Sequence, residues 1–208
     1  MNQQDEHKLA ILNQLMTHYG PQHWWEHENR LEDWVSMILV QQTTGTNAEK
    51  AVANLAPYLT VTGLSELDMD ELQRLIRPAG FYRQKSNYIK TLIAWYVAHG
   101  ANLAAFKSIP TPDLRRELLA IKGVGAETAD DMLLYIFERP VFIADTYARR
   151  LFNRLGFGPY QTYHQMQQEF DALAAQQSFA TCREWHAVID EHGKAYRRDE
   201  ALDESWIK

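Results

Sequence analysis

The segment from residue 119 to 129, LAIKGVGAETA, places two glycines, Gly123 and Gly125, on either side of Val124. Glycine tolerates backbone angles that other residues resist, so this spacing predicts a very tight turn between two helices. Such a turn leaves the first amide groups of the following helix unpaired and directed outward, with Thr128 able to hydrogen-bond near the helix start. These amides and the positive end of the helix dipole form a phosphate site that needs no lysine. Taken alone, the two glycines are equally typical of an ordinary helical hairpin.

Residues that start and stop helices place one helix on each side of this turn. Thr111, Pro112 and Asp113 have the order of an N-cap, a proline at the first helical position and an acid in the first turn. We therefore expect a helix from this point to about Ala120, and the helical pattern resumes from about residue 127 to 137.

The rest of the chain also has a helical pattern. Apolar residues recur at helical rather than alternating spacing, and strand signals are nearly absent. Asp68 and Glu71 have the spacing of a capping box, which predicts a helix through Ile76. Asp145 can cap a further helix that Gly156 ends. The sequence thus predicts an all-α protein of about ten short helices.

Composition sets the class of protein. The 208 residues are 46% hydrophobic and 23% charged, which is typical of folded soluble proteins and sufficient for one large or two small lobes. No apolar run approaches the roughly 20 residues of a membrane span, and the first residues lack a signal-peptide pattern, so we expect a cytoplasmic protein without membrane contact. A single cysteine, Cys182, excludes internal disulfides, a zinc ribbon and a cysteine-ligated iron–sulfur cluster within this chain, and we expect no metal site.

Charge by itself argues mildly against a nucleic-acid partner. The chain has 21 lysines and arginines against 27 acids, a net charge of −6. The basic residues are unevenly placed, however. Five lie between Arg74 and Lys90 with no acid among them, and Arg149, Arg150 and Arg154 follow Asp145. Such runs are either solvated helix faces or parts of a binding surface.

Longer motifs favour a nucleic-acid-binding surface over an ordinary hairpin with solvated helix faces. The full pattern L-x-x-I-x-G-V-G-x-x-T-A at residues 118–129 resembles the helix-hairpin-helix motif of DNA-binding proteins. The segment FIADTY around Asp145 is similar to the aspartate segment of the helix-hairpin-helix (HhH-GPD) DNA glycosylases of the endonuclease III superfamily. Residues 37–44 and 76–85 resemble two further landmarks of that family, a segment ending in a glutamine that enters the duplex and a GF-Y-x-x-K turn. The motifs occur in the family's order over roughly residues 24–196.

The resemblance implies a fold and a division of the chain. It implies two helical lobes with a DNA-binding cleft between them. The central lobe would comprise residues 35–138, with the hairpin at about 112–137. The second lobe would comprise residues 1–34 and 139–208, without an iron–sulfur cluster loop.

The implied partner is double-stranded DNA containing a damaged base; no protein partner can be inferred. An enzyme that acts on such a base in base excision repair must extrude it from the duplex. Gln42 would fill the resulting gap and hydrogen-bond the orphaned partner base. The hairpin would contact the DNA backbone through residues Lys122, Gly123, Val124, Gly125, Ala126 and Thr128.

Asp145 is the expected catalytic residue. Breaking an N-glycosidic bond places positive charge on the sugar, which a fixed carboxylate stabilises while it accepts a proton from the attacking water. As a helix cap, Asp145 would accept backbone amide hydrogen bonds that lower its pKa and keep it ionised at neutral pH.

Two departures from the family narrow the chemistry. Members that also cut the DNA strand use a lysine at the position of Glu127, and a carboxylate cannot form a Schiff base, so we expect a monofunctional enzyme without lyase activity. Arg197 stands at the position of the first cluster cysteine, so we expect no iron–sulfur cluster and no other cofactor.

Without this lysine and the cluster cysteines, the sequence is most similar to the 3-methyladenine glycosylase branch of the family. That resemblance implies hydrolytic release of an alkylated purine. Such a base is cationic, and aromatic faces attract a cation, so Trp24 and Trp25 are the candidates for the base pocket, with Trp34, Phe81 and Tyr82 ranked behind them. Two alternatives stay open: a glycosylase for uracil, mismatched thymine or an oxidised base, and a non-catalytic helix-hairpin-helix DNA-binding protein.

Overall fold

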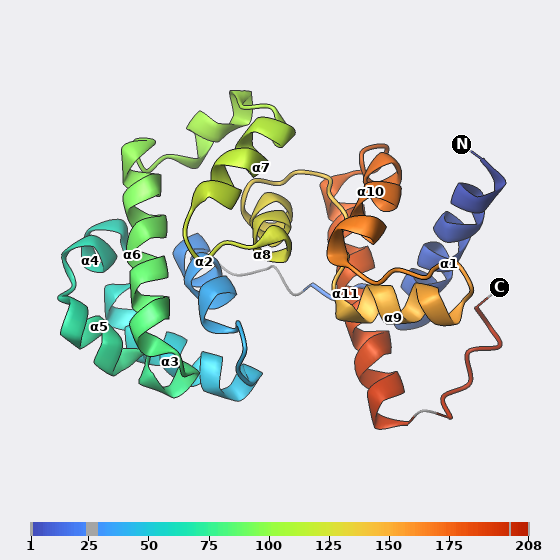
Figure 1. Ribbon diagram of the computed structural model, residues 1–208, viewed down its shortest axis with the longest axis horizontal. Coiled ribbons are helices and arrows are strands. Elements are labelled where there is room, and N and C mark those ends of the chain that lie inside the picture. The colour runs from blue at the N-terminus through green and yellow to red at the C-terminus, as the bar shows by residue number, and fades with distance from the viewer. Residues whose placement is uncertain (1, 24–28, 200, 208) are drawn as a thin grey trace. The chain divides into compact units, whose positions relative to one another are not determined.

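The structure is a computed structural model that describes residues 2–23, 29–199 and 201–207 (Figure 1). The described residues form helices and no β-strand, so the all-α prediction is confirmed. The chain divides into two compact units, a terminal unit of Met1–Glu26 with Glu138–Lys208 and an internal unit of His27–Phe137. No helix in these described ranges is long and apolar enough to cross a membrane.

The internal unit is built around one long helix, α6 (Tyr82–Ala98), which contacts α2, α4 and α5 (Figure 1). Its aromatic core joins Trp34 of α2 to Tyr96 and Phe137, with ring centroids 4.7 and 5.7 Å away. The α-helices of this unit are α2 (Arg30–Leu39), α3 (Gly45–Leu55), α4 (Val61–Glu66), α5 (Met69–Leu75), α6, α7 (Thr111–Ala120) and α8 (Ala126–Asp131). The short helices are η1 (Ala56–Tyr58), η2 (Arg77–Ala79), η3 (Leu103–Ser108) and the π-helical η4 (Met132–Ile136).

The helix before the glycine turn begins differently from the prediction. Pro110, not Thr111, is the N-cap of α7, since its carbonyl accepts hydrogen bonds from the amides of Asp113 and Leu114 at 3.0 Å. No side chain caps this end. The predicted end at Ala120 is confirmed, and so is the capping of α5 by Asp68, whose carboxylate accepts from two backbone amides.

The internal unit also begins earlier in the chain than the lobe boundary expected at residue 35. Helix α2 starts at Arg30, capped by the side chain of Asn29, and its Trp34 is 1% exposed. Trp34 therefore belongs to the core of this unit, which removes it from the candidates for a base pocket.

The terminal unit joins the two ends of the chain. Helix α1 (Gln3–Tyr19) packs against α11 (Phe179–Arg198), which also contacts α9 (Thr146–Arg154) (Figure 1). Helix α10 (Tyr163–Ala174) adds Phe170 to a core that includes Phe142 and Phe152, with ring centroids 4.4 and 4.7 Å from it. The predicted start of α9 after Asp145 and its end before Gly156, which has a φ of 83°, are both confirmed.

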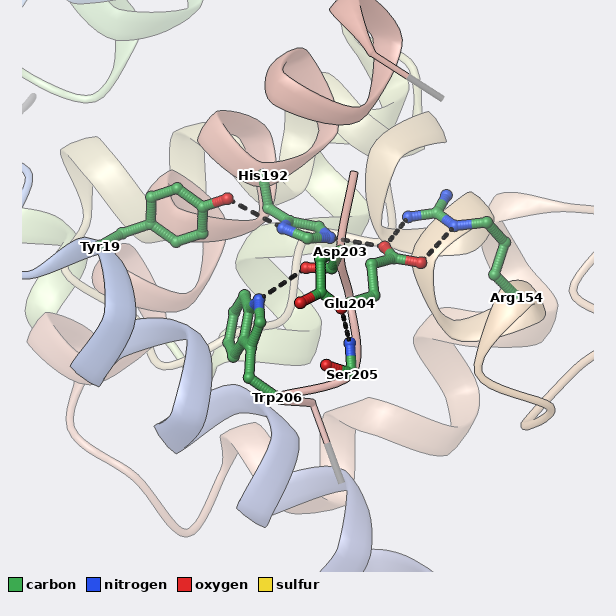
Figure 2. Close-up of polar contacts among 7 residues, drawn as sticks. All are labelled: Tyr19, Arg154, His192, Asp203, Glu204, Ser205 and Trp206. Carbon is green, nitrogen blue, oxygen red and sulfur yellow. Dashed lines mark hydrogen bonds and ion pairs between the residues drawn. The ribbon is translucent and has the colours of Figure 1, made fainter. Parts of the chain in front are cut away.

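A C-terminal tail, residues 201–207, closes onto this unit through Glu204 (Figure 2). The carboxylate of Glu204 accepts hydrogen bonds from Arg154 at 2.6 and 3.2 Å and lies 2.7 Å from Nε2 of His192. The other ring nitrogen of His192 is 2.9 Å from the hydroxyl of Tyr19. Helices α1, α9 and α11 are thus tied together by one carboxylate and one buried imidazole, whose pKa burial lowers.

Candidate functional site

The glycine hairpin adopts the predicted tight turn, with different roles for its two glycines. Gly123 has a φ of +94°, in the left-handed region, whereas Gly125 has a φ of −87° that any residue adopts. Gly125 is the N-cap of α8, and a Cβ built on it would have no neighbour within 4 Å. Ile121 and Val124 are 5% and 6% exposed, so they anchor the turn as expected. Among the described residues, no side chain caps this end of α8.

Helix α6 supports the hairpin from below through Tyr88. A Cβ on Gly123 would lie 2.1 Å from Cγ of Tyr88, so the ring occupies the space that any other residue would need. Gly123 is therefore required both by its backbone angle and by this close approach. The sequence pattern had no signal for Tyr88, because its partner lies 35 positions away in the chain.

Gln41 ties the end of α2 to the same hairpin. Its Nε2 donates hydrogen bonds to the carbonyl of Gly123 at 3.2 Å and to Oγ1 of Thr128 at 3.1 Å. The side chain of Thr128 is 9% exposed, and its Oγ1 accepts this bond from Gln41. Thr128 thus braces the hairpin from within, and its expected contact with DNA stays a prediction.

A buried ion pair braces the two hairpin helices against each other. Arg115 of α7 donates from Nε and Nη2 to the two carboxylate oxygens of Asp130 on α8, at 2.6 and 3.0 Å. Asp130 has no exposed surface. Two-point pairing fixes the angle between the planar groups as well as their distance, so it holds α7 and α8 in one orientation.

Gln42 and Phe81 share a strained and exposed conformation next to the hairpin. Gln42 has a φ of 52° and Phe81 a φ of 45°, which both cost energy for residues with a Cβ. Phe81 is 57% exposed, which is unusual for a large apolar ring. Both residues border a cavity of about 330 Å³ in the internal unit. Its lining residues are Gln41, Gln42, Phe81, Gln84, Lys85, Tyr88, Gly123, Val124 and Gly125.

Lys85, the lysine of the GF-Y-x-x-K turn, is buried rather than offered to a ligand. Its ammonium donates to the carbonyl of Leu39 at 2.7 Å and to that of Ala79 at 2.9 Å, and burial lowers its pKa. It joins the end of α2 to η2 and so positions the loops that carry Gln42 and Phe81. Lys122, by contrast, is exposed beside the hairpin.

Asp145 lies in the terminal unit as the N-cap of α9. Its Oδ1 accepts a hydrogen bond from the amide of Ala148 at 2.7 Å, as predicted. The predicted direction of the pKa shift is wrong, because burial of the carboxyl outweighs the backbone bonds and raises its pKa to about 6. The carboxylate of Asp190 on α11 raises it further. At pH 7 the group is still largely ionised, and its basicity is close to that suited to a general base.

Helix α11 approaches the start of α9 closely at Gly193. A Cβ on Gly193 would lie 2.3 Å from Cδ1 of Tyr147, two residues after Asp145. On the same helix, Asp190 forms an ion pair with Lys194 at 2.5 Å. Gly193 thus fixes how the Asp145 segment packs on α11.

Two of the predicted residues cannot be placed. Trp24 and Trp25 lie outside the described residues.

Glu127 is exposed on the first turn of α8, and Ala126 beside it is partly exposed.

The residues present do not fit an iron–sulfur cluster. The chain has one cysteine, Cys182, which is buried in α11 with its Sγ 3.7 Å from the carbonyl of Ala174. Arg197 occupies the last turn of the same helix. Across the described part of the chain, no group of three or more histidine, cysteine or acidic side chains could hold a metal ion.

Comparison with known proteins identifies the family. Residues 35–176 match the HhH-GPD superfamily of base excision DNA repair proteins. The chain is 38% identical over 193 residues to a protein of Methanocaldococcus jannaschii whose name places it among DNA repair glycosylases, covering 90% of this chain and 87% of that one. Endonuclease III of Thermotoga maritima is 34% identical over 125 residues, 59% of this chain and 55% of that one.

The fold has the same relatives. The crystal structure of the Helicobacter pylori 3-methyladenine DNA glycosylase MagIII bound to 1,N6-ethenoadenine superposes with a TM-score of 0.72 and 24% identity, over 94% of this chain and 98% of that one. Hairpin, aspartate segment, family match and fold agree, and the chain therefore belongs to the HhH-GPD DNA glycosylases of the endonuclease III superfamily, enzymes of base excision repair.

Proposed function

We propose that this glycosylase is monofunctional and hydrolyses the N-glycosidic bond of a flipped-out alkylated purine such as 3-methyladenine. The observation that carries the chemistry is Asp145, a half-buried helix-capping carboxylate whose pKa is raised to about 6. Its negative charge stabilises the cationic sugar of the transition state, and its raised basicity allows it to take a proton from the attacking water at neutral pH.

The hairpin and the two strained loops form the proposed DNA-binding surface of the internal unit. The backbone amides at Gly125 and Ala126, where no described side chain caps α8, and the exposed side chain of Lys122 bind the phosphate backbone. Gln42 enters the duplex in place of the extruded base, and Phe81 stacks on a neighbouring base, which explains why a large apolar ring is held exposed.

The absence of strand cleavage is proposed from Glu127. The position at which lyase members of the family carry a lysine holds a carboxylate here, which cannot form an imine with the sugar. Asp145 is left to activate water, so the product is an intact strand with an abasic site.

An alkylated purine is the proposed substrate because its release needs the least catalytic assistance from the enzyme. Alkylation at a ring nitrogen makes the base a cationic leaving group, and no general acid is then required. Aromatic faces select a cationic base over a neutral one, and Trp24 and Trp25 remain the proposed pocket residues. We further propose that the protein works without an iron–sulfur cluster, since its residues do not provide the ligands.

Base release from a panel of single-lesion duplexes tests this function. The intact protein is expected to release 3-methyladenine from methylated DNA without nicking until alkali is added, and Asp145→Asn to abolish release. Asp68→Asn is the matched control, because Asp68 caps α5 as Asp145 caps α9 and loses the same charge. Full release by Asp145→Asn would overturn the mechanism.

The same panel decides between the proposal and its alternatives. Release of uracil, mismatched thymine or an oxidised base in place of 3-methyladenine would keep the mechanism and change the substrate. Binding to every duplex without release from any would indicate a non-catalytic DNA-binding protein.

A further inference from the structure

A second cavity lies in the terminal unit, between α9 and α11, and is lined by arginines. Its volume is about 460 Å³. Three of its lining residues carry guanidinium groups, and none carries a carboxylate. The lining residues are Tyr147, Arg150, Asn153, Arg154, Gly193, Tyr196 and Arg197. The cavity is therefore positively charged, although the whole chain has a net charge of −6.

One of the three arginines is already neutralised. Arg154 pairs with both carboxylate oxygens of Glu204 at 2.6 and 3.2 Å (Figure 2), and its guanidinium lies 3.6 Å from the ring centroid of Tyr196. The side-chain amide of Asn153 is also occupied, because it bonds both the amide and the carbonyl of Tyr160. These two residues form the wall of the cavity and are not available to a ligand.

Arg150 and Arg197 are different. Within the part of the chain that the structure describes, neither forms an ion pair or a hydrogen bond, and both are exposed. Arg197 lies in the last turn of α11, where a cation favours the helix dipole, but Arg150 lies in the middle of α9, where no such reason exists. Two like charges that share one cavity repel each other unless an anion lies between them.

Gly193 brings the two helices together at this point. Because Tyr147 packs against the bare backbone of Gly193, α9 and α11 are close enough to border the cavity from both sides. Arg150 lies five residues after Asp145, so the cavity is little more than one helical turn from the catalytic carboxylate.

We propose that Arg150 and Arg197 bind a backbone phosphate of the DNA substrate in this cavity. The planar fork of a guanidinium matches two phosphate oxygens, and one phosphodiester shared by two arginines relieves their mutual repulsion. This inference rests on the proposed function, because the phosphate bound in the cavity would be one next to the nucleotide on which Asp145 acts. The terminal unit would then contact the DNA backbone through side chains rather than through backbone amides.

The test is binding of an undamaged duplex at several salt concentrations, by fluorescence anisotropy, without any need for base release. Arg150→Gln with Arg197→Gln is expected to weaken binding about tenfold and to reduce the slope of log K against log salt by about 0.9, the value for one phosphate. Arg198→Gln is the control for Arg197→Gln alone and is compared with that single variant as well, since each removes one positive charge from neighbouring positions of α11. Equal effects of Arg198→Gln and the double variant would overturn the proposal.

Conservative variants separate charge from folding. Arg150→Lys with Arg197→Lys is expected to keep the salt slope and to lose part of the affinity, because a lysine keeps the charge without the fork. A double Gln variant with a lower melting temperature but an unchanged salt slope would show that the arginines only stabilise the helices, and it would overturn the proposal.

A third experiment distinguishes binding of a DNA phosphate from binding of free inorganic phosphate. Inorganic phosphate at constant ionic strength is added to the intact protein and to the double Gln variant, and the melting temperature is measured. A phosphate effect that disappears in the variant, together with unchanged duplex binding, would overturn the DNA assignment. A wild-type protein that binds no duplex at all would overturn the proposed function as well, whereas loss specific to the Arg150 and Arg197 variants supports both.

Discussion

The hairpin of the internal unit and the Asp145 segment of the terminal unit are built in opposite ways. In the hairpin, the groups proposed to meet DNA are mainly backbone amides, and side chains serve as braces, as Gln41 and Tyr88 do. In the Asp145 segment, one side chain is proposed to carry the chemistry, and the backbone amide of Ala148 donates a hydrogen bond to it. The hairpin should therefore control binding of the DNA duplex, and the Asp145 segment should control the rate of base release.

The difference also shows why net charge is a poor guide to this protein. An amide site adds nothing to a count of lysines and arginines, and a carboxylate at the proposed catalytic position makes the net charge more negative. A chain with a net charge of −6 therefore presents no contradiction to membership in a DNA repair family.

The largest expected effect separates rate from binding. Asp145→Asn should lower the single-turnover rate of base release by about 10³-fold or more, because it removes both the electrostatic stabilisation and the general base. Affinity for the lesion duplex should stay within a few fold, since asparagine is an equally good N-cap. Parallel kinetic and anisotropy measurements check this, and a large loss of affinity would contradict the division of roles.

The next effect concerns binding. Gly123→Ala should weaken duplex binding by roughly two orders of magnitude and destabilise the fold by about 2 kcal/mol or more, since alanine resists the left-handed conformation and meets Tyr88. Gly100→Ala is the control, because Gly100 has a φ of +78° but nothing within 4 Å of its Cβ position. Adding Tyr88→Ala should restore only the steric part. Equal losses in both glycine variants would show that Tyr88 does not brace the hairpin.

The third effect is a pH dependence set by Asp145. Because its pKa in the folded protein is about 6, the rate of base release should fall about tenfold per unit as pH drops below 6. A carboxyl group with a raised folded pKa stabilises the fold when protonated, and this stability is lost as pH rises through 6. Asp145→Asn should therefore be more stable than the wild type at pH 7, by about 3 kcal/mol, and equal to it near pH 3. Chemical denaturation at the two pH values checks the sign.

The smallest effect concerns Gln41. Gln41→Ala removes the bonds to Gly123 and Thr128, so duplex binding should weaken about three- to tenfold, with no change in the rate at saturating enzyme. Thr128→Val removes the acceptor at Thr128 and leaves the bond to Gly123. Its loss of affinity should be smaller than that of Gln41→Ala, and a larger loss would indicate that Thr128 itself contacts DNA.

The local features of the site were predictable from sequence, because they depend on neighbours along the chain. The turn at Gly123, the capping of α5 by Asp68 and the capping of α9 by Asp145 all follow from residue types within a few positions. The start of α7 was placed one residue late, because proline with an extended ψ can supply the capping carbonyl without a polar side chain.

The amino-acid sequence by itself determined the helical class, the hairpin, the family and the absence of cysteine ligands for a cluster, since each follows from residue identity and spacing. Only the tertiary structure decided the burial of Thr128 and Lys85, the exposure of Phe81 and the raised pKa of Asp145. These properties depend on contacts between segments far apart in the chain, as between Gln41 and the hairpin or between Asp190 and Asp145. Solvent exclusion is a property of the packed molecule, and no local pattern of residues contains it.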